Sequence, residues 1–280
     1  MKQRDLDLVV ISDTHLGTYG CHAEELLNYL CSIQPKTLVL NGDFIDIWQF
    51  KKRFFPKPHI QIIHRVLKMA EEGTKVYYIT GNHDDNLRRY ADFSTGNIFL
   101  RNQLTIHLHH KKYWFFHGDV FDLSVQYAPM IAKIGGKSYD YLIRMNRLIN
   151  EIRAQMGLPK MSLSKRIKDG VKQATKAVDD FEEKAIQLAM EKSYDYVVCG
   201  HIHQPQMRTI KREDGTVLTY LNSGDWVENL TALEYTQGEW QIYRYEEDYF
   251  DSQSYTSEML LRDQDTTSLF EQMIKMAAKA

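Results

Sequence analysis

Short apolar runs alternate with helical patterns through the first third of the chain. Leu6–Ser12, Thr37–Leu40 and Lys75–Thr80 are rich in branched and aromatic apolar residues, which is typical of buried strands. Between them, Ala23–Ser32 and the stretch around Ile60–Glu72 carry apolar residues at helical spacing. Alternating strands and helices predict β-α-β units and a parallel sheet, with functional sites at the carboxyl ends of its strands.

Beyond residue 97 the pattern changes to short strands joined by short links, which favours antiparallel pairing. Lys111 and Lys112 are predicted to form the turn between two of these strands. The last three strands, at Val217–Asn222, Thr231–Tyr235 and Trp240–Tyr245, are predicted to close the fold by antiparallel pairing. The segments predicted to be strands are Ile98–Arg101, Leu104–His109, Tyr113–Phe116, Asp195–Cys199, Val217–Asn222, Thr231–Tyr235 and Trp240–Tyr245.

A long helical stretch interrupts the strand pattern at residues 124–192. Between residues 130 and 178 it contains eleven Lys or Arg and only three Asp or Glu. Such a basic amphipathic segment fits an anionic membrane surface or a phosphorylated ligand, and it also fits a solvated face. We predict one domain over residues 1–250, with 124–192 inserted as a helical cap, followed by a polar tail over 251–280.

Composition excludes several classes of protein. The chain has 280 residues, of which 43% are hydrophobic and 26% charged, with a net charge of −2. These values exclude a disordered, collagen-like or disulfide-stapled protein. No apolar run reaches the ~18 residues of a membrane span, and the start lacks the features of a signal peptide. Its three cysteines, none in a C-x-x-C motif, are expected to be reduced thiols, so a cytoplasmic protein is expected.

Five predicted strands run directly into residues that can bind a metal. Each of these motifs alone is a weak signal, but five of them at strand ends predict one shared site. Each lies beside a glycine or a tight turn, and glycine allows the backbone to approach a metal closely. The five motifs are Ser12-Asp13-Thr14-His15, Asn41-Gly42-Asp43, Gly81-Asn82-His83-Asp84, His117-Gly118-Asp119 and Gly200-His201-Ile202-His203.

This succession of D-x-H, G-D, G-N-H-D, H-G-D and G-H-x-H strongly resembles the calcineurin-like metallophosphoesterase superfamily. The resemblance covers residues 5–120 and 194–235. It implies a four-layer α+β or α/β fold, in which helices flank a central β-sandwich and two divalent metal ions lie at the sheet ends. The ligands that it implies are Asp13, His15 and His203 for the first metal, Asn82, His117 and His201 for the second, and Asp43 as a bridge between them.

The ligand types agree with this resemblance. Carboxylate, imidazole and amide ligands suit manganese, iron or zinc rather than calcium, and we expect manganese. Two ions that share a carboxylate lower the pKa of a bridging water and hold the phosphoryl oxygens. We expect His83 to donate a hydrogen bond or proton to the phosphate or leaving oxygen, while Asp84 holds its other nitrogen. A helix N-cap is an equally compatible role for Asp84, and Asp119 is a candidate to support the ligands.

Six further histidines are not assigned to the metals. Three of them, His107, His109 and His110, lie on a predicted hairpin that ends in two lysines, so we interpret them as solvated. The other three, which we expect to be surface or packing residues, are His22, His59 and His64. Cys199 lies within an apolar strand and is expected to be buried and inert.

The basic cap favours one branch of the superfamily. It resembles the UDP-2,3-diacylglucosamine diphosphatases of lipid A synthesis, which cut a pyrophosphate bond in a nucleotide-linked glycolipid. The best-characterised of these enzymes have Arg where this chain has His83. The implied partners are a phosphorylated, nucleotide- or lipid-linked substrate and the anionic inner face of the cell membrane, but no nucleic acid. The candidate substrate-binding residues are Arg88, Arg144, Arg147 and Arg153.

Two other functions remain open. A nucleotide or nucleic-acid phosphodiesterase could use the basic cap to grip a polyanion, although the cap has few interleaved aromatic residues for stacking bases. A non-catalytic scaffold could keep the fold and lose the chemistry. Loss of a ligand would favour the scaffold, whereas all seven ligand positions are filled here.

Overall fold

The computed structural model describes residues 3–47, 55–124, 180–212 and 214–245. The chain divides into two compact units, Met1–Asp119 with Ile186–Ala280, and Val120–Ala185. Most of the predicted cap at 124–192 and all of the predicted tail at 251–280 lie outside the described residues, so the division into one domain with a cap and a tail stays a prediction.

A seven-stranded sheet has the order β12-β11-β1-β2-β3-β5-β4. The strands β1, β2 and β3 are parallel, as the alternating pattern predicts. The antiparallel pairing predicted for Ile98–Arg101 is wrong in part, because this strand, β5, is parallel to β3 and antiparallel only to the short β4. Strands β11 and β12 are antiparallel, as predicted. The parallel strands place their carboxyl ends at one edge of the sheet. The strands are β1 (Arg4–Ile11), β2 (Ile33–Asn41), β3 (Lys75–Ile79), β4 (Ser94–Thr95), β5 (Ile98–Arg101), β11 (Thr231–Thr236) and β12 (Glu239–Arg244).

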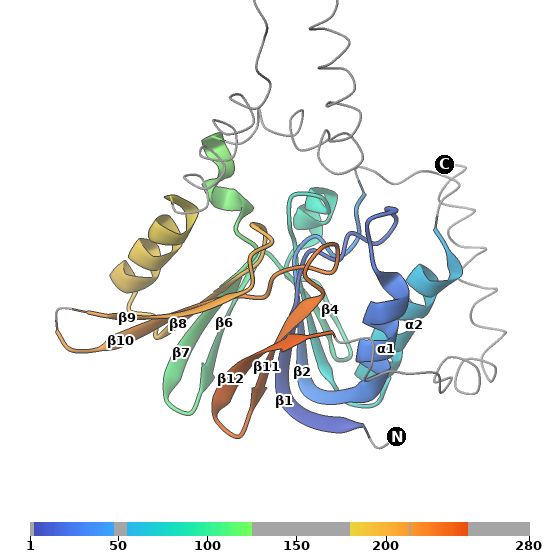
Figure 1. Ribbon diagram of the computed structural model, residues 1–280, viewed down its shortest axis with the longest axis horizontal. Coiled ribbons are helices and arrows are strands. Elements are labelled where there is room, and N and C mark those ends of the chain that lie inside the picture. Colours follow the sequence, from blue (N-terminus) through green and yellow to red (C-terminus); the bar gives the residue numbers. More distant parts are fainter. Residues whose placement is uncertain (1–2, 48–54, 125–179, 213, 246–280) are drawn as a thin grey trace, which may run out of the picture. The chain divides into compact units, whose positions relative to one another are not determined.

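Two helices, α1 (Ala23–Ser32) and α2 (Lys57–Glu71), pack on one face of this sheet (Figure 1). The bounds of α1 match the predicted helix, and its first turn carries Glu24 and Glu25, which suit the positive end of the helix dipole. The second helix begins at Lys57, three residues before the predicted stretch. Its first turn contains Pro58, and proline is tolerated there because its missing N–H would have no partner within the helix. Apolar side chains of both helices share a buried cluster with alternate residues of β1 and β2.

A five-stranded sheet has the order β6-β7-β8-β10-β9. Its centre is parallel, since β7 pairs with β8 and β8 with β10, and its edges are antiparallel. The predicted antiparallel strand at Val217–Asn222 is therefore antiparallel only to β9 and parallel to β8. The strands are β6 (Gln103–Leu108), β7 (Lys111–Phe116), β8 (Tyr196–Cys199), β9 (Gln206–Lys211) and β10 (Val217–Asn222).

The turn between β6 and β7 differs from the prediction. His109 and His110 form it, with φ angles of 49° and 63°, whereas Lys111 and Lys112 already belong to β7. Two left-handed residues in succession give a turn whose twist matches that of the paired strands. His109 is not simply solvated, because its Nδ1 lies 2.8 Å from the hydroxyl of Tyr235.

The two sheets pack face to face. Val10 and Val39 of the seven-stranded sheet share a second buried cluster with Phe115, Val198 and Leu221 of the five-stranded sheet. The fold is therefore a β-sandwich with helices on an outer face, as predicted (Figure 1). Two short 3-10 helices, η1 (Asp85–Tyr90) and η2 (Asp119–Ser124), follow strands β3 and β7, and residues 180–191 form a helix.

Cys199 is fully buried, as predicted, and none of the three cysteines, all of which lie in the described residues, forms a disulfide. Within the described part of the chain, none of the helices has the length and apolar character needed to cross a membrane.

Candidate metal centre

The strand ends of both sheets carry the predicted metal-binding motifs. In the seven-stranded sheet, Asp13, Asp43 and Asn82 follow the ends of the parallel strands β1, β2 and β3. In the five-stranded sheet, His117 and His201 follow the ends of the parallel strands β7 and β8. Since parallel strands end at the same edge of a sheet, each sheet brings its own residues together there.

Backbone hydrogen bonds join the loops of the seven-stranded sheet to one another. The N–H of Asp13 donates to the carbonyl of Gly42 at 3.1 Å, and the N–H of His15 donates to the carbonyl of Asp43 at 3.0 Å. The N–H of Ile47 donates to the carbonyl of His83 at 3.0 Å. These bonds continue the pairing of the strands beyond their ends, so the loops that carry the motifs are held in fixed positions.

Five motif residues adopt left-handed backbone conformations. Non-glycine residues seldom have positive φ, and each such residue costs about 1–3 kcal/mol unless its surroundings compensate. The clustering of such residues indicates that the fold holds these side chains in place for a purpose. The residues are Asp13 (φ 52°), His15 (48°), Asp43 (52°), His201 (71°) and His203 (54°).

Two glycines allow the strand ends to approach the motif side chains closely. A Cβ at Gly42 would lie 2.3 Å from Nδ1 of His117, and φ at Gly42 is 85°. A Cβ at Gly81 would lie 2.2 Å from Oδ1 of Asp43. No side chain fits in either place, which agrees with the predicted need for glycine beside the motifs.

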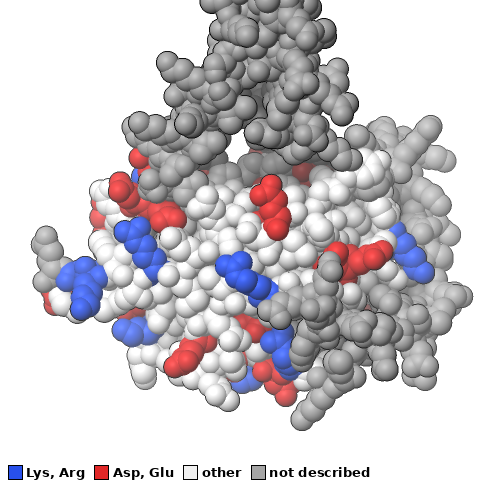
Figure 2. All heavy atoms as spheres, in the orientation of Figure 1, with Lys and Arg blue, Asp and Glu red and all other residues white. Residues whose placement is uncertain are grey.

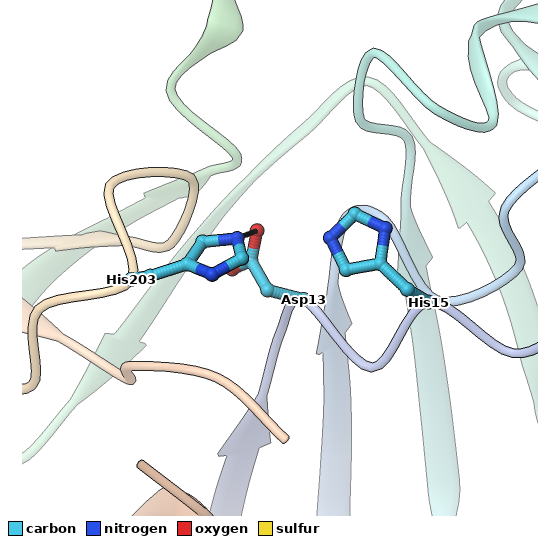
Figure 3. A group of neighbouring side chains, drawn as sticks. All are labelled: Asp13, His15 and His203. Carbon is cyan, nitrogen blue, oxygen red and sulfur yellow. Dashed lines mark ion pairs between the residues drawn. The ribbon is translucent and has the colours of Figure 1, made fainter. Parts of the chain in front are cut away.

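Asp13, His15 and His203 form one group of side chains (Figure 3). One potential ligand atom from each lies within 4.8 Å of the others. Oδ1 of Asp13 is 3.3 Å from Nε2 of His203, which reaches it from the loop after β8. The Asp13 side chain is fully buried, whereas that of His203 is 32% exposed.

Asp43, His117 and His201 form a second group with the same mutual spacing. Oδ2 of Asp43 is 3.3 Å from Nε2 of His117. The same oxygen is 3.9 Å from Nε2 of His15, which belongs to the first group. Asp43 therefore lies between the two groups.

Three buried polar atoms at this centre have no hydrogen-bond partner among the described residues: Oδ1 of Asp13, Oδ1 of Asn82 and Nε2 of His117. Oδ1 of Asp13 and Nε2 of His117 each lie 3.3 Å from an oppositely charged group but make no hydrogen bond. Buried polar atoms are normally hydrogen-bonded, so three that are not, at one place, indicate a missing ligand. Nδ1 of His117 is 2.9 Å from the carbonyl of Asn41, which orients the ring with Nε2 towards Asp43. A carboxylate oxygen, an amide oxygen and an imidazole nitrogen are donors that a divalent metal ion accepts.

The buried carboxylates and imidazoles at the centre shift one another's pKa. Burial by itself raises the pKa of Asp13 and Asp43, but neighbouring histidines outweigh it, lowering the pKa of Asp13 and bringing that of Asp43 to about 2. Burial lowers the pKa of His203 and His117, yet the carboxylates of Asp13 and Asp43 raise the pKa of His203 to about 9 and that of His117 well above its ordinary value. Without a metal, imidazolium ions therefore balance the buried carboxylates, and a metal cation can replace them.

Comparison with known proteins agrees with these features. The sequence profile of the calcineurin-like phosphoesterase family matches residues 6–205, more than half of the chain. This chain belongs to the calcineurin-like phosphoesterase family. It is accordingly a phosphoesterase, with the fold predicted from its motifs.

Curated relatives of this phosphoesterase share much of its length. A UDP-2,3-diacylglucosamine hydrolase from Aliivibrio fischeri is 23% identical, over 86% of this chain and 99% of the relative. A second, from Blochmanniella pennsylvanica, is 24% identical over 79% of this chain and 88% of the relative. Among solved structures, a phosphoesterase from E. coli covers 85% of this chain and 99% of its own, with 14% identity and a TM-score of 0.40.

In this phosphoesterase, His83 contacts a residue that we did not predict. Nδ1 of His83 lies 2.9 Å from Oδ2 of Asp46, and Nδ1 of His15 lies 3.3 Å from the same oxygen. The prediction that Asp84 holds the second nitrogen of His83 is wrong, because Asp46 has that position. Burial lowers the pKa of His83, but Asp46 and Asp43 outweigh it and leave that pKa raised.

Asp84 instead connects two loops. Its buried carboxylate accepts hydrogen bonds from the N–H groups of Gly81 at 2.5 Å and Phe44 at 3.2 Å. The hydroxyl of Tyr78 donates a third, at 2.6 Å. Asp84 occupies the N-cap position of η1, as the alternative predicted, but its side chain makes no capping hydrogen bond to the helix. Its contacts support the loops that carry Asp43 and Asn82.

Of the four predicted arginines, the structure describes Arg88, which contacts Asp119. Arg88 forms ion pairs with Asp119 and, at 2.6 Å, with Asp85, so two carboxylates already neutralise it. Asp119 also helps to raise the pKa of His117, but its effect is smaller than those of Asp43 and Asp13. On the face in Figure 2, acidic and basic side chains of the described residues are intermixed. The arginines outside the described residues are Arg144, Arg147 and Arg153.

Sequence reasoning missed two supporting residues, and each had a signal. Asp46 follows Asp43 by three residues in the same loop, where a second carboxylate beside a predicted ligand could have been noticed. Asn41 belongs to the Asn41-Gly42-Asp43 motif, but we assigned it no role from the sequence. It supports β7 and β8 through its Nδ2, which donates to the carbonyl of Phe116 at 3.1 Å and to that of Val198 at 3.4 Å.

Proposed function

We propose that this phosphoesterase works with two divalent metal ions that share Asp43. The observation that carries the proposal is the position of Oδ2 of Asp43, which lies 3.3 Å from Nε2 of His117 and 3.9 Å from Nε2 of His15. One carboxylate thus reaches both groups of side chains. The proposed ligands besides Asp43 are Asp13, His15 and His203 for one ion and Asn82, His117 and His201 for the other.

Manganese is the proposed metal, with iron or zinc as alternatives. The ligands combine carboxylates, imidazoles and one amide, and none is a thiolate, which suits metals of intermediate character. When bound, such a pair of ions polarises phosphoryl oxygens and makes a nucleophile available from water at neutral pH.

His83 is the proposed proton or hydrogen-bond donor. Asp46 contacts its Nδ1, so its Nε2 is directed towards the centre, 4.0 Å from Oδ2 of Asp43. Asp46 also favours the protonated ring, since it raises the pKa of His83 against the effect of burial. A protonated ring in this position can donate to the phosphate or to the leaving oxygen as negative charge develops there.

The proposed substrate is UDP-2,3-diacylglucosamine or a closely related lipid-linked pyrophosphate. Support comes from curated relatives that carry the name UDP-2,3-diacylglucosamine hydrolase and match most of this chain. Arg88 is a weaker candidate for substrate binding than its sequence suggested, because its charge is already balanced by Asp85 and Asp119. A cytoplasmic location and contact of the cap with an anionic membrane also remain part of this proposal.

Product analysis tests the substrate. The full chain, supplied with Mn²⁺, is incubated with UDP-2,3-diacylglucosamine and with a panel of simple phosphodiesters, and the products are identified by mass spectrometry. Pyrophosphate cleavage predicts UMP and a diacylglucosamine 1-phosphate, with an Asp43→Asn control giving neither. Hydrolysis of the phosphodiesters with no cleavage of the lipid substrate would favour a nucleotide phosphodiesterase and contradict the proposal.

A further inference from the structure

A buried histidine outside the proposed ligand set contacts one of the metal-binding loops. His59 is the third residue of α2 and is only 4% exposed. Its Nδ1 accepts a hydrogen bond from the N–H of Gly17 at 2.9 Å. Gly17 is buried and lies two residues after His15, a proposed ligand. The contact therefore connects a core helix to the loop that presents this ligand.

Three successive N–H groups hold this loop. The N–H of His15 donates to the carbonyl of Asp43 at 3.0 Å, and that of Leu16 donates to the carbonyl of Phe44 at 2.9 Å. These two bonds use the backbone of the neighbouring loop. The third, from Gly17, depends on a side chain, that of His59. Without that side chain the buried N–H would lose its acceptor, which destabilises this loop conformation by leaving a buried donor unsatisfied.

The loop needs this support because its backbone is in an unfavourable conformation. His15 has φ 48° and Gly17 has φ 99°, and a non-glycine residue keeps a positive φ only when its surroundings hold it there. We propose that His59 is a positioning residue, which fixes the ligand His15 through the N–H of Gly17. This inference rests on the proposed metal centre.

Two features of His59 suit this role. The helix that carries it is anchored in the core through Ile62, Val66 and Met69, so the acceptor atom has a fixed position. Burial lowers the pKa of His59 to about 4, so the ring is neutral at pH 7. In that state one ring nitrogen keeps the lone pair that the N–H of Gly17 requires.

The test compares His59→Ala with His59→Asn in the full chain. The Oδ1 of asparagine occupies nearly the same place as Nδ1 of histidine, so the second variant keeps an acceptor for Gly17. Binding of Mn²⁺ alone is measured by calorimetric titration after chelation. We expect His59→Ala to weaken one of the two Mn²⁺ sites by about 10–100-fold, and His59→Asn to restore most of that affinity.

Val66→Ala is the matched control for simple loss of stability. Val66 is buried on the same helix and has no role at the metal centre, so this change lowers the melting temperature. It should leave Mn²⁺ affinity unchanged. Equal weakening of Mn²⁺ binding by Val66→Ala and His59→Ala would overturn the inference, because it would show only a general effect of a weaker core.

Hydrogen exchange at the Gly17 amide gives a readout that needs neither metal nor substrate. Exchange should be faster in His59→Ala and return towards the wild-type rate in His59→Asn. A folded His59→Ala protein with unchanged Gly17 exchange and unchanged Mn²⁺ affinity would make His59 a packing residue. A wild-type protein that binds no Mn²⁺, zinc or iron would contradict the proposed function, and the exchange rates would still decide the contact between His59 and Gly17.

Discussion

The two groups of side chains at the metal centre differ in how deeply the protein encloses them. In the group of Asp43, His117 and His201, the side chains of His117 and Asp43 are 0% and 3% exposed. In the group of Asp13, His15 and His203, the His15 and His203 side chains are 11% and 32% exposed. Two of the three side chains in the first of these groups are thus closed within the sandwich and His201 is half-buried, whereas both histidines of the second group are partly exposed.

Different supports explain this difference. The ring of His117 is fixed by the carbonyl of Asn41, which lies at the end of β2 between the two sheets. The backbone of His203 is held by the loop between β10 and β11, because Nδ2 of Asn229 in that loop donates to the carbonyl of His203 at 2.9 Å. Asp225 orders that loop by accepting the N–H groups of residues 227–229. Strand ends give a rigid site, and loops give a site that solvent and substrate can reach.

The largest expected effect comes from the residue shared by both groups. Asp43→Asn removes one negative charge beside His15 and His117, so metal binding in both groups should weaken together. Hydrolysis should fall below detection. Elemental analysis and steady-state rates check this result, and a variant with two bound metals and near-normal turnover would refute a shared residue.

The next largest effect distinguishes a catalytic role of His83 from a role in metal binding. His83→Ala should keep both metals and lose about 10²–10⁴-fold in rate, because it removes a proton or hydrogen-bond donor. The loss should shrink with p-nitrophenyl substrates, whose leaving group needs little help. Elemental analysis is decisive here, since His83 also lies within ligand distance of His15 and Asp43. Loss of metal in the variant would make His83 a ligand and the proposed role wrong.

The difference in burial predicts unequal effects on stability. His117→Ala leaves a cavity and removes the partner of a buried carboxylate, which should cost roughly 3 kcal/mol in free energy of unfolding. His203→Ala also removes a partner of a buried carboxylate, that of Asp13, but the His203 side chain is 32% exposed, so water can fill its place and the cost should be roughly 1 kcal/mol. Denaturant unfolding of the metal-free variants measures both values. Equal losses would contradict the difference in enclosure between the two groups.

The smallest effect concerns pH in the metal-free protein. The pKa of His203 is raised from 6.5 to about 9, so its protonated ring stabilises the fold fully below pH 6.5. That contribution is lost as pH rises from 6.5 through 9. The melting temperature of the chelated protein should therefore fall over this range, and His203→Gln should reduce the slope. An unchanged slope in that variant would show that the ion pair with Asp13 adds no stability.

Much of the fold could be predicted because apolar patterning determines its central elements. The runs at Leu6–Ser12, Thr37–Leu40 and Lys75–Thr80 are buried in the sandwich, so their composition reveals them. β9 was missed because Gln206–Lys211 is a largely exposed edge strand, with no apolar alternation to detect. The turn at His109 and His110 was missed because histidine carries no strong turn signal.

The candidate site could be predicted in its motifs but not in all of its contacts. Motif order indicated which strand ends carry ligand residues, since parallel strands bring their ends together. The partner of His83 depends on how the loops after β2 and β3 fold over each other, and local sequence favoured the adjacent Asp84 over Asp46. Whether a carboxylate reaches the ring or the backbone is decided by tertiary geometry, which spacing along the chain does not reveal.

The proposed function depends on one carboxylate, that of Asp43, joining two metal ions. The most direct test is electron paramagnetic resonance of the full chain loaded with two equivalents of Mn²⁺, compared with Asp43→Asn. We expect a magnetically coupled Mn²⁺ pair in the wild type and loss of that coupled signal in the variant. Two Mn²⁺ ions with uncoupled signals in the wild type, or a coupled pair that persists in Asp43→Asn, would contradict the proposed function.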